Sequence, residues 1–167
     1  MNFKVTYPAP SDIEKMCLIA EKIFSAEADT TQTKPTVENT LDLISIEKNT
    51  LVCIKENGEV VAWTVVLPTS KNNMNRFLSG EITERELSFE SKKDPSFEAL
   101  YLMAGITLPL YRKRGLSLQL ITYQIDYFKH KYNMRDFYSL PFSESGKSLI
   151  QKISANLNII IKIPSNI

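Results

Sequence analysis

The chain has 167 residues, a formal net charge of +1 and 43% apolar residues. This length and apolar content predict a single folded domain over residues 1–167 and exclude a disordered chain. The balanced charge argues against a dedicated nucleic-acid-binding protein, which would be markedly basic. The sequence has neither an apolar run long enough to span a membrane nor the apolar core of a signal peptide. The expected protein is therefore cytoplasmic, with no nucleic-acid or membrane partner.

Few residues could bind a metal or form a disulfide. Cys17 and Cys53 lie in apolar periodic segments, which favours buried free thiols over a disulfide or a metal site. The one histidine, His130, lies between two lysines near the end of a predicted helix. A surface cation is a better interpretation of this position than a catalytic base. We expect no metal centre.

The N-terminal segment predicts a strand followed by a helix. Residues 3–7 alternate apolar and polar side chains, as in a half-buried strand, and Pro8 and Pro10 would end it. Ser11 and Glu14 have the spacing of a capping box, which predicts the start of the helix. Apolar residues then recur on one helical face: Ile13, Met16, Cys17, Ala20, Ile23 and Phe24.

A loop, a second helix and a hairpin are predicted next. Residues 25–35 are polar and predict the loop, and Thr36 is the candidate cap of the second helix. Asn57 and Gly58, between two runs rich in strand formers, are typical of a hairpin turn. The second helix is expected to direct three apolar residues inward: Val37, Leu41 and Ile44.

Residues 68–95 predict two short helices inserted between strands. The first is expected to stop at Gly80. Thr83 and Glu86 form a second capping box, with Ile82 and Leu87 placed as its hydrophobic staple. The insert also carries several glutamates, which we interpret as a solvated face rather than an acidic rim for a cationic amine: Glu81, Glu84, Glu86 and Glu90.

A basic glycine turn between a strand and a helix is the most informative feature. Residues 97–108 predict a buried strand that Pro109 ends, and helical spacing resumes after Gly115. A helix start carries free N–H groups and a partial positive charge, so it binds phosphate. Three basic residues precede this helix start and would add side-chain charge: Arg112, Lys113 and Arg114.

Alternation along the predicted strand at residues 97–108 separates its side chains into two sets. One face would carry Tyr101, Met103, Gly105 and Thr107, and the other Glu98, Leu100, Leu102 and Ala104. Gly105 indicates a bulge or a close backbone approach. Further on, residues 137–140 predict a parallel strand, Ser143 or Ser145 would cap a helix, and residues 158–163 predict a last strand.

The segment Pro109-x-Tyr111-Arg112-x-x-Gly115-x-Ser117 resembles the acyl-CoA signature R/Q-x-x-G-x-G/A of the GCN5-related N-acetyltransferases. Two positions depart from the wider family pattern. Thr107 replaces an aliphatic residue, and Ser117 replaces the last small Gly or Ala.

The resemblance implies an α/β fold with a mixed, mostly antiparallel sheet, splayed central strands and a shortened C-terminus. It also implies acetyl-CoA as cofactor, with main-chain contacts from the central strand to the pantetheine arm and phosphate contacts from the glycine turn. The first helix pair and its loop would line the acceptor side. The cofactor-binding residues carried over are Ile106, Thr107, Leu108, Arg112, Lys113, Arg114, Gly115, Leu116, Ser117 and Ser143.

The activity implied is N-acetyl transfer to a primary amine of a small molecule or peptide by direct attack. Ile150 stands where family members often have a tyrosine that protonates the leaving thiolate. Tyr138, Tyr101 and Glu98 are the candidates for proton transfer in its place. The alternative is an acyl-CoA-binding sensor of the same fold with little or no catalysis. A missing terminal strand would also leave a sheet edge that a second copy could cover, giving a homodimer.

Overall fold

The structure is a computed structural model that describes residues 3–25 and 29–164. Its six-stranded sheet has the order β1-β2-β3-β4-β5-β6. The strands are β1 (Val5–Thr6), β2 (Leu51–Glu56), β3 (Glu59–Thr69), β4 (Ala99–Thr107), β5 (Asp136–Ser139) and β6 (Ile161–Lys162). The strands β1 to β4 pair with one another in antiparallel order, whereas β5 is parallel to both β4 and β6. This confirms the predicted mixed, mostly antiparallel α/β fold.

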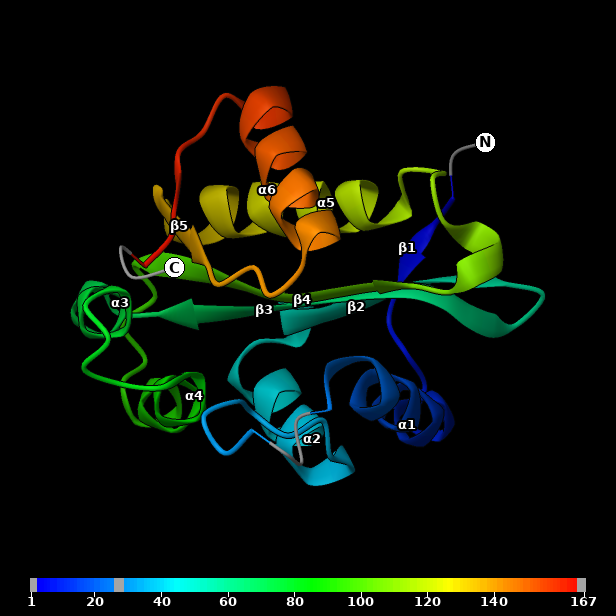
Figure 1. The fold of residues 1–167 in the computed structure, drawn as a ribbon, viewed down its shortest axis with the longest axis horizontal. Coiled ribbons are helices and arrows are strands. Elements are labelled where there is room, and N and C mark those ends of the chain that lie inside the picture. The colour runs from blue at the N-terminus through cyan, green and yellow to red at the C-terminus, as the bar shows by residue number, and fades with distance from the viewer. Residues whose placement is uncertain (1–2, 26–28, 165–167) are drawn as a thin grey trace.

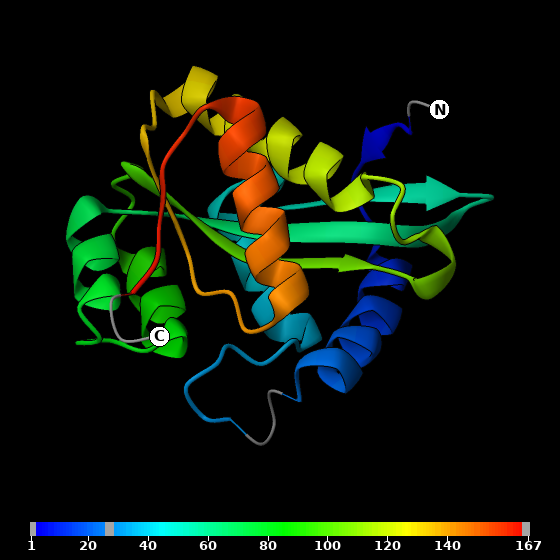
Figure 2. The same ribbon diagram turned by 45° about the horizontal axis from the view of Figure 1, so that its top comes forward.

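Helices cover both faces of the sheet (Figures 1 and 2). The helices α1 to α4 lie on one side, and α5 and α6 cross the other. The helices are α1 (Pro10–Phe24), α2 (Val37–Ile46), α3 (Lys71–Leu78), α4 (Glu84–Lys93), α5 (Leu116–Tyr132) and α6 (Glu144–Leu157), with short 3-10 turns η1 (Lys48–Thr50) and η2 (Pro109–Tyr111). In the part of the chain that the structure describes, no helix is long and apolar enough to cross a membrane.

The first helix starts earlier than predicted. Pro10 occupies the first helical turn, where its missing N–H costs nothing, instead of ending the strand. The Asp12 carboxylate accepts from the Ala9 N–H at 2.6 Å and forms an ion pair with Lys55. The predicted capping box of Ser11 and Glu14 is therefore wrong, because the helix begins two residues earlier: Ala9 is the N-cap, and Asp12 takes the N3 role expected of Glu14.

The second helix is capped as predicted, but a different residue points into the core. Thr36 Oγ1 accepts from the Asn39 N–H at 3.1 Å. Val37 and Leu41 are exposed, whereas Leu43 is buried. The predicted inward face was therefore wrong at two positions. Part of the predicted loop at residues 25–35, namely 26–28, lies outside the described residues.

Local turn chemistry is confirmed at the hairpin and in the insert. Asn57 and Gly58 join β2 to β3 with φ angles of +52° and +85°, as the predicted hairpin turn requires. Thr83 Oγ1 accepts from the Glu86 N–H, and the Glu86 carboxylate accepts in return from the Thr83 N–H at 2.8 Å. Ile82 is buried in the same apolar cluster as Leu87.

A β-bulge interrupts the pairing of β4 with β3. Val65 pairs with Ala104, but Val66 pairs with Leu102, so Met103 is the extra residue. The sequence suggested a bulge at Gly105, and the structure has it two residues earlier, at Met103. One extra residue inverts the alternation of side chains beyond it.

The inverted alternation decides which side chains face which helices. Tyr101 and Met103 pack on the side of α2, α3 and α4, and Ile106 packs against α1. Gly105 and Thr107 instead face α5 and α6: a Cβ atom at Gly105 would meet side chains of both helices, and the Thr107 hydroxyl bonds α5. The prediction that Gly105 and Thr107 share a face with Tyr101 is therefore wrong.

A buried carboxylate fastens the far end of α5 to η1. Glu47 accepts hydrogen bonds from Lys131 Nζ at 2.8 Å, from the Tyr127 hydroxyl at 3.0 Å and from the Tyr132 hydroxyl. Burial raises the pKa of Glu47, but the hydrogen bonds from Lys131 and the two tyrosines outweigh it and lower the pKa from 4.5 to about 2. The folded state therefore favours the charged form.

Glu47→Gln is expected to destabilise the protein near neutral pH by about 2 kcal/mol, a figure reduced because Lys131 is half exposed. A lowered carboxyl pKa stabilises the fold above the unfolded pKa of 4.5, and this contribution is lost as the pH falls toward about 2. Denaturant unfolding across this range should show the two proteins converging at low pH. A difference that is the same at every pH would contradict the assignment.

Candidate active site

The parallel strands β4 and β5 separate halfway along β4. Only Ala99–Leu102 pair with β5, and the Ser139 hydroxyl donates to the Leu102 carbonyl at 2.9 Å where the pairing ends. Beyond Leu102 the edge of β4 on this side has no partner strand among the described residues. A splayed central pair, as the resemblance implied, is thus present.

The register with β3 determines which main-chain groups face this gap. The Leu108 N–H donates to the Val61 carbonyl at 3.0 Å. Because bonded and non-bonded pairs alternate along an antiparallel ladder, Ile106 also directs its main chain toward β3. Gly105 and Thr107 direct theirs toward the gap. Of the three predicted pantetheine contacts, only Thr107 directs its main chain toward the gap, and Gly105, which the prediction did not include, does so too.

The N-terminus of α5 is open at the end of the gap. Gly115 precedes the helix with φ +76° and offers no side chain to cap it, and a Cβ there would meet nothing within 4 Å. Arg112 Nε donates to the Thr107 carbonyl at 3.3 Å, and Arg114 Nη2 to the Leu110 carbonyl at 3.1 Å. These bonds hold the exposed basic side chains near the turn. Lys113, also exposed, adopts φ +63°.

Two side-chain contacts fasten this turn to its neighbours. Ser117 Oγ lies 2.8 Å from Thr107 Oγ1, which joins the first turn of α5 to the end of β4. The Tyr111 hydroxyl donates to Glu56 at 2.6 Å, which joins the turn to the β2–β3 hairpin. Leu116 is buried below the turn. The predicted cofactor-binding residues 112–117 therefore lie together at the tip of α5, with Leu116 buried beneath the others.

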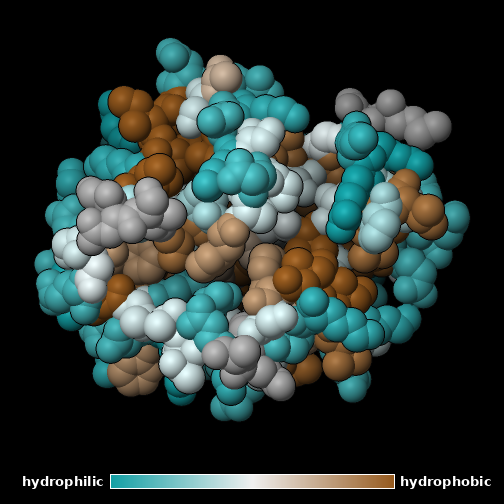
Figure 3. Space-filling model, viewed as in Figure 1, coloured by the Kyte–Doolittle hydropathy of each residue, from teal (hydrophilic) through white to brown (hydrophobic). Residues whose placement is uncertain are grey.

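A recess opens on the opposite side of β4, next to the bulge. It encloses about 90 Å³ and is bounded by α1, the α1–α2 loop, α2, the sheet and the start of α4. In the view of Figure 1, the space-filling picture in Figure 3 shows hydrophobic side chains, in brown, beside a hollow near the middle of the molecule. Its apolar lining includes Met16, Phe24, Leu43, Trp63, Met103 and Ile106. The helix pair and loop that the resemblance assigned to the acceptor side are the elements that form this recess.

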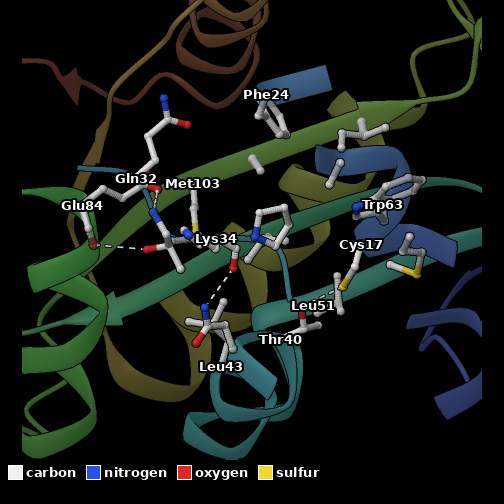
Figure 4. A pocket seen from close by; sticks show the side chains of 18 of the residues that line it. Cys17, Phe24, Gln32, Lys34, Thr40, Leu43, Leu51, Trp63, Glu84 and Met103 are labelled. Carbon is white, nitrogen blue, oxygen red and sulfur yellow. Dashed lines mark hydrogen bonds between the residues drawn. The ribbon is translucent and has the colours of Figure 1, made fainter. Parts of the chain in front are cut away.

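One buried carboxylate lies at the end of this recess. Glu84, the first residue of α4, is 7% exposed. One carboxylate oxygen accepts from the Thr33 N–H at 3.1 Å, and the other from the Tyr101 hydroxyl at 2.7 Å. Figure 4 shows Glu84 beside Gln32 and Met103, at the end away from Trp63 and Cys17.

The surroundings of Glu84 disfavour its charged form. Burial raises the pKa of Glu84, and the charge of Asp29 adds to this, while the hydrogen bonds from Tyr101 and Thr33 act in the opposite direction. Burial also raises the pKa of the Tyr101 hydroxyl, and the charge of Glu84 raises it further. The proton shared in this hydrogen bond therefore stays on the Tyr101 hydroxyl, which donates, and Glu84 accepts.

The predicted proton-transfer residues lie outside this recess. Tyr138 is buried, and its hydroxyl lies 2.8 Å from Thr69 Oγ1. Glu98 accepts from the Lys71 N–H at 3.1 Å at the far end of β4. The Tyr101 hydroxyl donates to Glu84, which lines the recess, but Tyr101 is not itself a lining residue.

Ser143, which precedes α6, and Ile150 within it both have structural roles. Ser143 caps the helix by accepting from the Gly146 N–H at 3.1 Å. Ile150 packs against the apolar cluster under α5 and α6. Ser143 is thus engaged as a cap, and the side chain at the usual tyrosine position is half-buried against the apolar core.

Sequence analysis placed Glu84 among solvated glutamates, and that interpretation was wrong for this residue. Glu84 lies at i, i+3, i+4 and i+7 spacing with Leu87, Ser88 and Ser91, all of which are buried. That spacing marks one helical face, so the periodicity contained the signal. The interpretation of Glu81 as solvated holds: its side chain is 60% exposed and pairs with Arg76.

Among the described residues, no group of three or more histidines, cysteines or carboxylates is placed to hold a metal ion. Both cysteines are buried and free, as predicted. His130 is exposed in the last turn of α5, where Nδ1 lies 2.6 Å from the Asp126 carbonyl.

The sequence matches no protein-family model and no curated protein. Its structure is similar to solved ones. AAC(6')-Iy, solved with the bisubstrate analogue CoA-S-monomethyl-acetylneamine, is 13% identical with a TM-score of 0.60, covering 100% of this chain and 95% of that chain. A transcriptional regulator from Bacillus halodurans C-125 is 14% identical with a TM-score of 0.59, covering 95% and 93%.

Ard1 from Thermoplasma volcanium is 15% identical with a TM-score of 0.53, covering 80% of this chain and 68% of that chain. At identities this low, the structural similarity shows the fold alone, and the chemistry has to be argued from the site. The architecture shared with these proteins is the one that the glycine turn implied.

Proposed function

We propose that this chain, which has the fold of the GCN5-related N-acetyltransferases, transfers an acetyl group from acetyl-CoA to a primary amine by direct attack in a ternary complex. The observation that carries the proposal is the continuity of three features around β4. An open helix tip lies at one end of the strand, an unpaired strand edge follows it, and a recess with a buried carboxylate lies beside the bulge.

The open tip of α5 suits the diphosphate of coenzyme A. Main-chain N–H groups at a helix start bind phosphate, and the exposed Arg112, Lys113 and Arg114 add positive charge. The free edge at Gly105 and Thr107 suits the pantetheine arm, whose amides can add to a strand edge as a peptide does. The thioester would then lie near Met103, between the gap and the recess.

Positioning supplies much of the rate in such a reaction. A main-chain N–H of β4 near the bulge would polarise the thioester carbonyl. Tyr138 and Tyr101 are engaged in buried hydrogen bonds, and Ile150 cannot donate a proton. We therefore assign the leaving thiolate's proton to the amine itself, transferred directly or through water.

A test begins with calorimetric titration of coenzyme A and acetyl-CoA, followed by thiol release with a panel of amines. We expect micromolar affinity for the cofactor and amine-dependent release. Absence of binding at millimolar coenzyme A would contradict the proposal.

A catalytically inactive acyl-CoA-binding module is the second candidate. The observation that favours it is Ile150, an apolar side chain packed against the core at the position where the family often has its acid. Tight cofactor binding without release of thiol from any amine would support this candidate over the enzyme.

A further inference from the structure

Glu84 is a buried carboxyl group without a cationic partner among the described residues. No lysine, arginine or histidine in residues 3–25 and 29–164 forms an ion pair with it. Its two donors, the Thr33 N–H and the Tyr101 O–H, occupy about half of the acceptor sites of a carboxylate. Buried carboxylates are strongly disfavoured unless paired. The remaining lone pairs are therefore available to a ligand that enters the recess.

The rest of the recess is poorly suited to a polar ligand. Only Glu84 and Lys34 among its lining residues carry charged side chains, and the opposite end is formed by Trp63 and Cys17 (Figure 4). Phe142, from the loop after β5, lies at the rim and is 53% exposed. The polar side chains Gln32, Thr33, Asn39 and Thr40 also line the recess, but each already hydrogen-bonds within the protein. A polyhydroxylated ligand would therefore have to displace these bonds or leave buried hydroxyls without partners, which is unfavourable.

We propose that Glu84 binds the ammonium group of the acceptor and accepts its proton, and that the acceptor is a small monoamine with an apolar body. This inference rests on the proposed function and names its substrate class. The ammonium would meet Glu84 near Met103, and the apolar body would extend along the recess toward Trp63. Tyr101 is a positioning residue, because its hydroxyl holds the carboxylate without reaching the recess itself.

The transfer balances without a further reactant. The ammonium gives one proton to the Glu84 carboxylate, and the neutral nitrogen forms the C–N bond with the thioester carbon. The C–S bond breaks, its electron pair leaves on sulfur, and the second proton of the nitrogen reaches the thiolate. The amide and coenzyme A thiol are the products, and Glu84 returns its proton to solvent.

Several ionisable groups surround Glu84 and bear on its pH dependence. The Tyr101 hydroxyl contacts it from β4, and Asp29 acts on it from the α1–α2 loop. Lys34 of the same loop and Cys17 of α1 line the recess. Because the hydrogen bond from Tyr101 lowers the pKa of Glu84, Tyr101→Phe should move the acid limb of the rate profile to higher pH.

The experiment compares 2-phenylethylamine, glucosamine and a short peptide with a free N-terminus as acceptors for acetyl-CoA. We expect kcat/KM for 2-phenylethylamine to exceed that for the other two by about 100-fold, since hydroxyls and peptide groups lose their hydrogen bonds in the recess. Glu84→Gln should reduce kcat/KM by about 100-fold or more, with KM raised and kcat lowered.

Two controls separate a lost function from a lost fold. Glu84→Gln should bind coenzyme A as the wild type does and should melt at the same or a higher temperature near neutral pH, because a neutral amide replaces a buried group whose ionisation is unfavourable. Glu90→Gln, on the same helix but outside the recess lining, should leave the kinetics unchanged.

The outcomes distinguish this inference from the proposed function. Coenzyme A binding with amine acetylation that is unaffected by Glu84→Gln overturns the inference alone. A preference for glucosamine or the peptide overturns the assigned substrate class. Cofactor binding without acetylation of any acceptor overturns the inference and favours the inactive module, and no cofactor binding overturns both.

Discussion

Gly115→Glu is expected to abolish coenzyme A binding, with Kd raised at least about 100-fold, or about 2.7 kcal/mol. The new carboxylate would enter the open space at the tip of α5, where a Cβ meets no atom within 4 Å. Negative charge there opposes the phosphates and competes for the N–H groups that would hold them. Calorimetric titration of coenzyme A measures the effect.

Gly80→Glu provides a matched control. Gly80 has φ +77° beside +76° at Gly115, and a Cβ there also meets nothing within 4 Å. Both variants therefore carry the same strain of about 1–2 kcal/mol from a left-handed backbone. Only Gly115 lies at the N-terminus of α5, whereas Gly80 follows the C-terminus of α3. Gly115→Ala isolates the strain at the tip itself and should change Kd little. Equal affinity losses in the two glutamate variants would show that strain, not phosphate repulsion, caused the effect.

Gln124→Leu is expected to destabilise the protein by about 3 kcal/mol. Gln124 is 0% exposed in the middle of α5. Its amide nitrogen donates to the carbonyls of Asn49 at 2.9 Å and Thr50 at 3.1 Å, and its oxygen accepts from the Thr64 hydroxyl at 2.8 Å. Leucine fills a similar volume but leaves these buried groups without partners.

Thermal unfolding should show Tm lowered by about 6–12 °C for a chain of this length. Gln151→Leu, on an exposed position of α6, should stay within about 0.5 kcal/mol of the wild type. Thr64→Val removes a single hydroxyl and should cost about 1 kcal/mol. If Gln124→Leu melted with the wild type, the buried amide could not be what holds α5 to η1 and β3.

Predictions that depend on a few neighbouring residues were confirmed. The Asn57–Gly58 turn, the Thr83 capping box and the strand–turn–helix around Gly115 each follow from backbone preferences and hydrogen bonds within a few residues. The same reasoning failed at α1, where Ser11 and Asp12 are both good capping residues. The helix begins two residues before the predicted cap, at Ala9, and Asp12 at the N3 position accepts from the Ala9 N–H and gains a second partner in Lys55 of β2.

The acceptor side depended on contacts between distant segments. Gly105 indicated a bulge in β4, but its position at Met103 depends on the register with β3, where β4 has one extra residue. Glu84 becomes a buried site residue because Thr33, 51 positions earlier, and Tyr101, 17 positions later, are brought against it. A carboxylate in a capping-box helix is equally compatible with a solvated face.

The amino-acid sequence alone determined the order of strands and helices and the glycine turn before α5, because those features arise from periodicity, caps and glycine conformation within short stretches. Only the tertiary structure decided which edge of β4 is free, which of its main-chain groups face the gap, and which glutamate lines the recess. These depend on register and burial, which are set by packing between elements far apart in the chain.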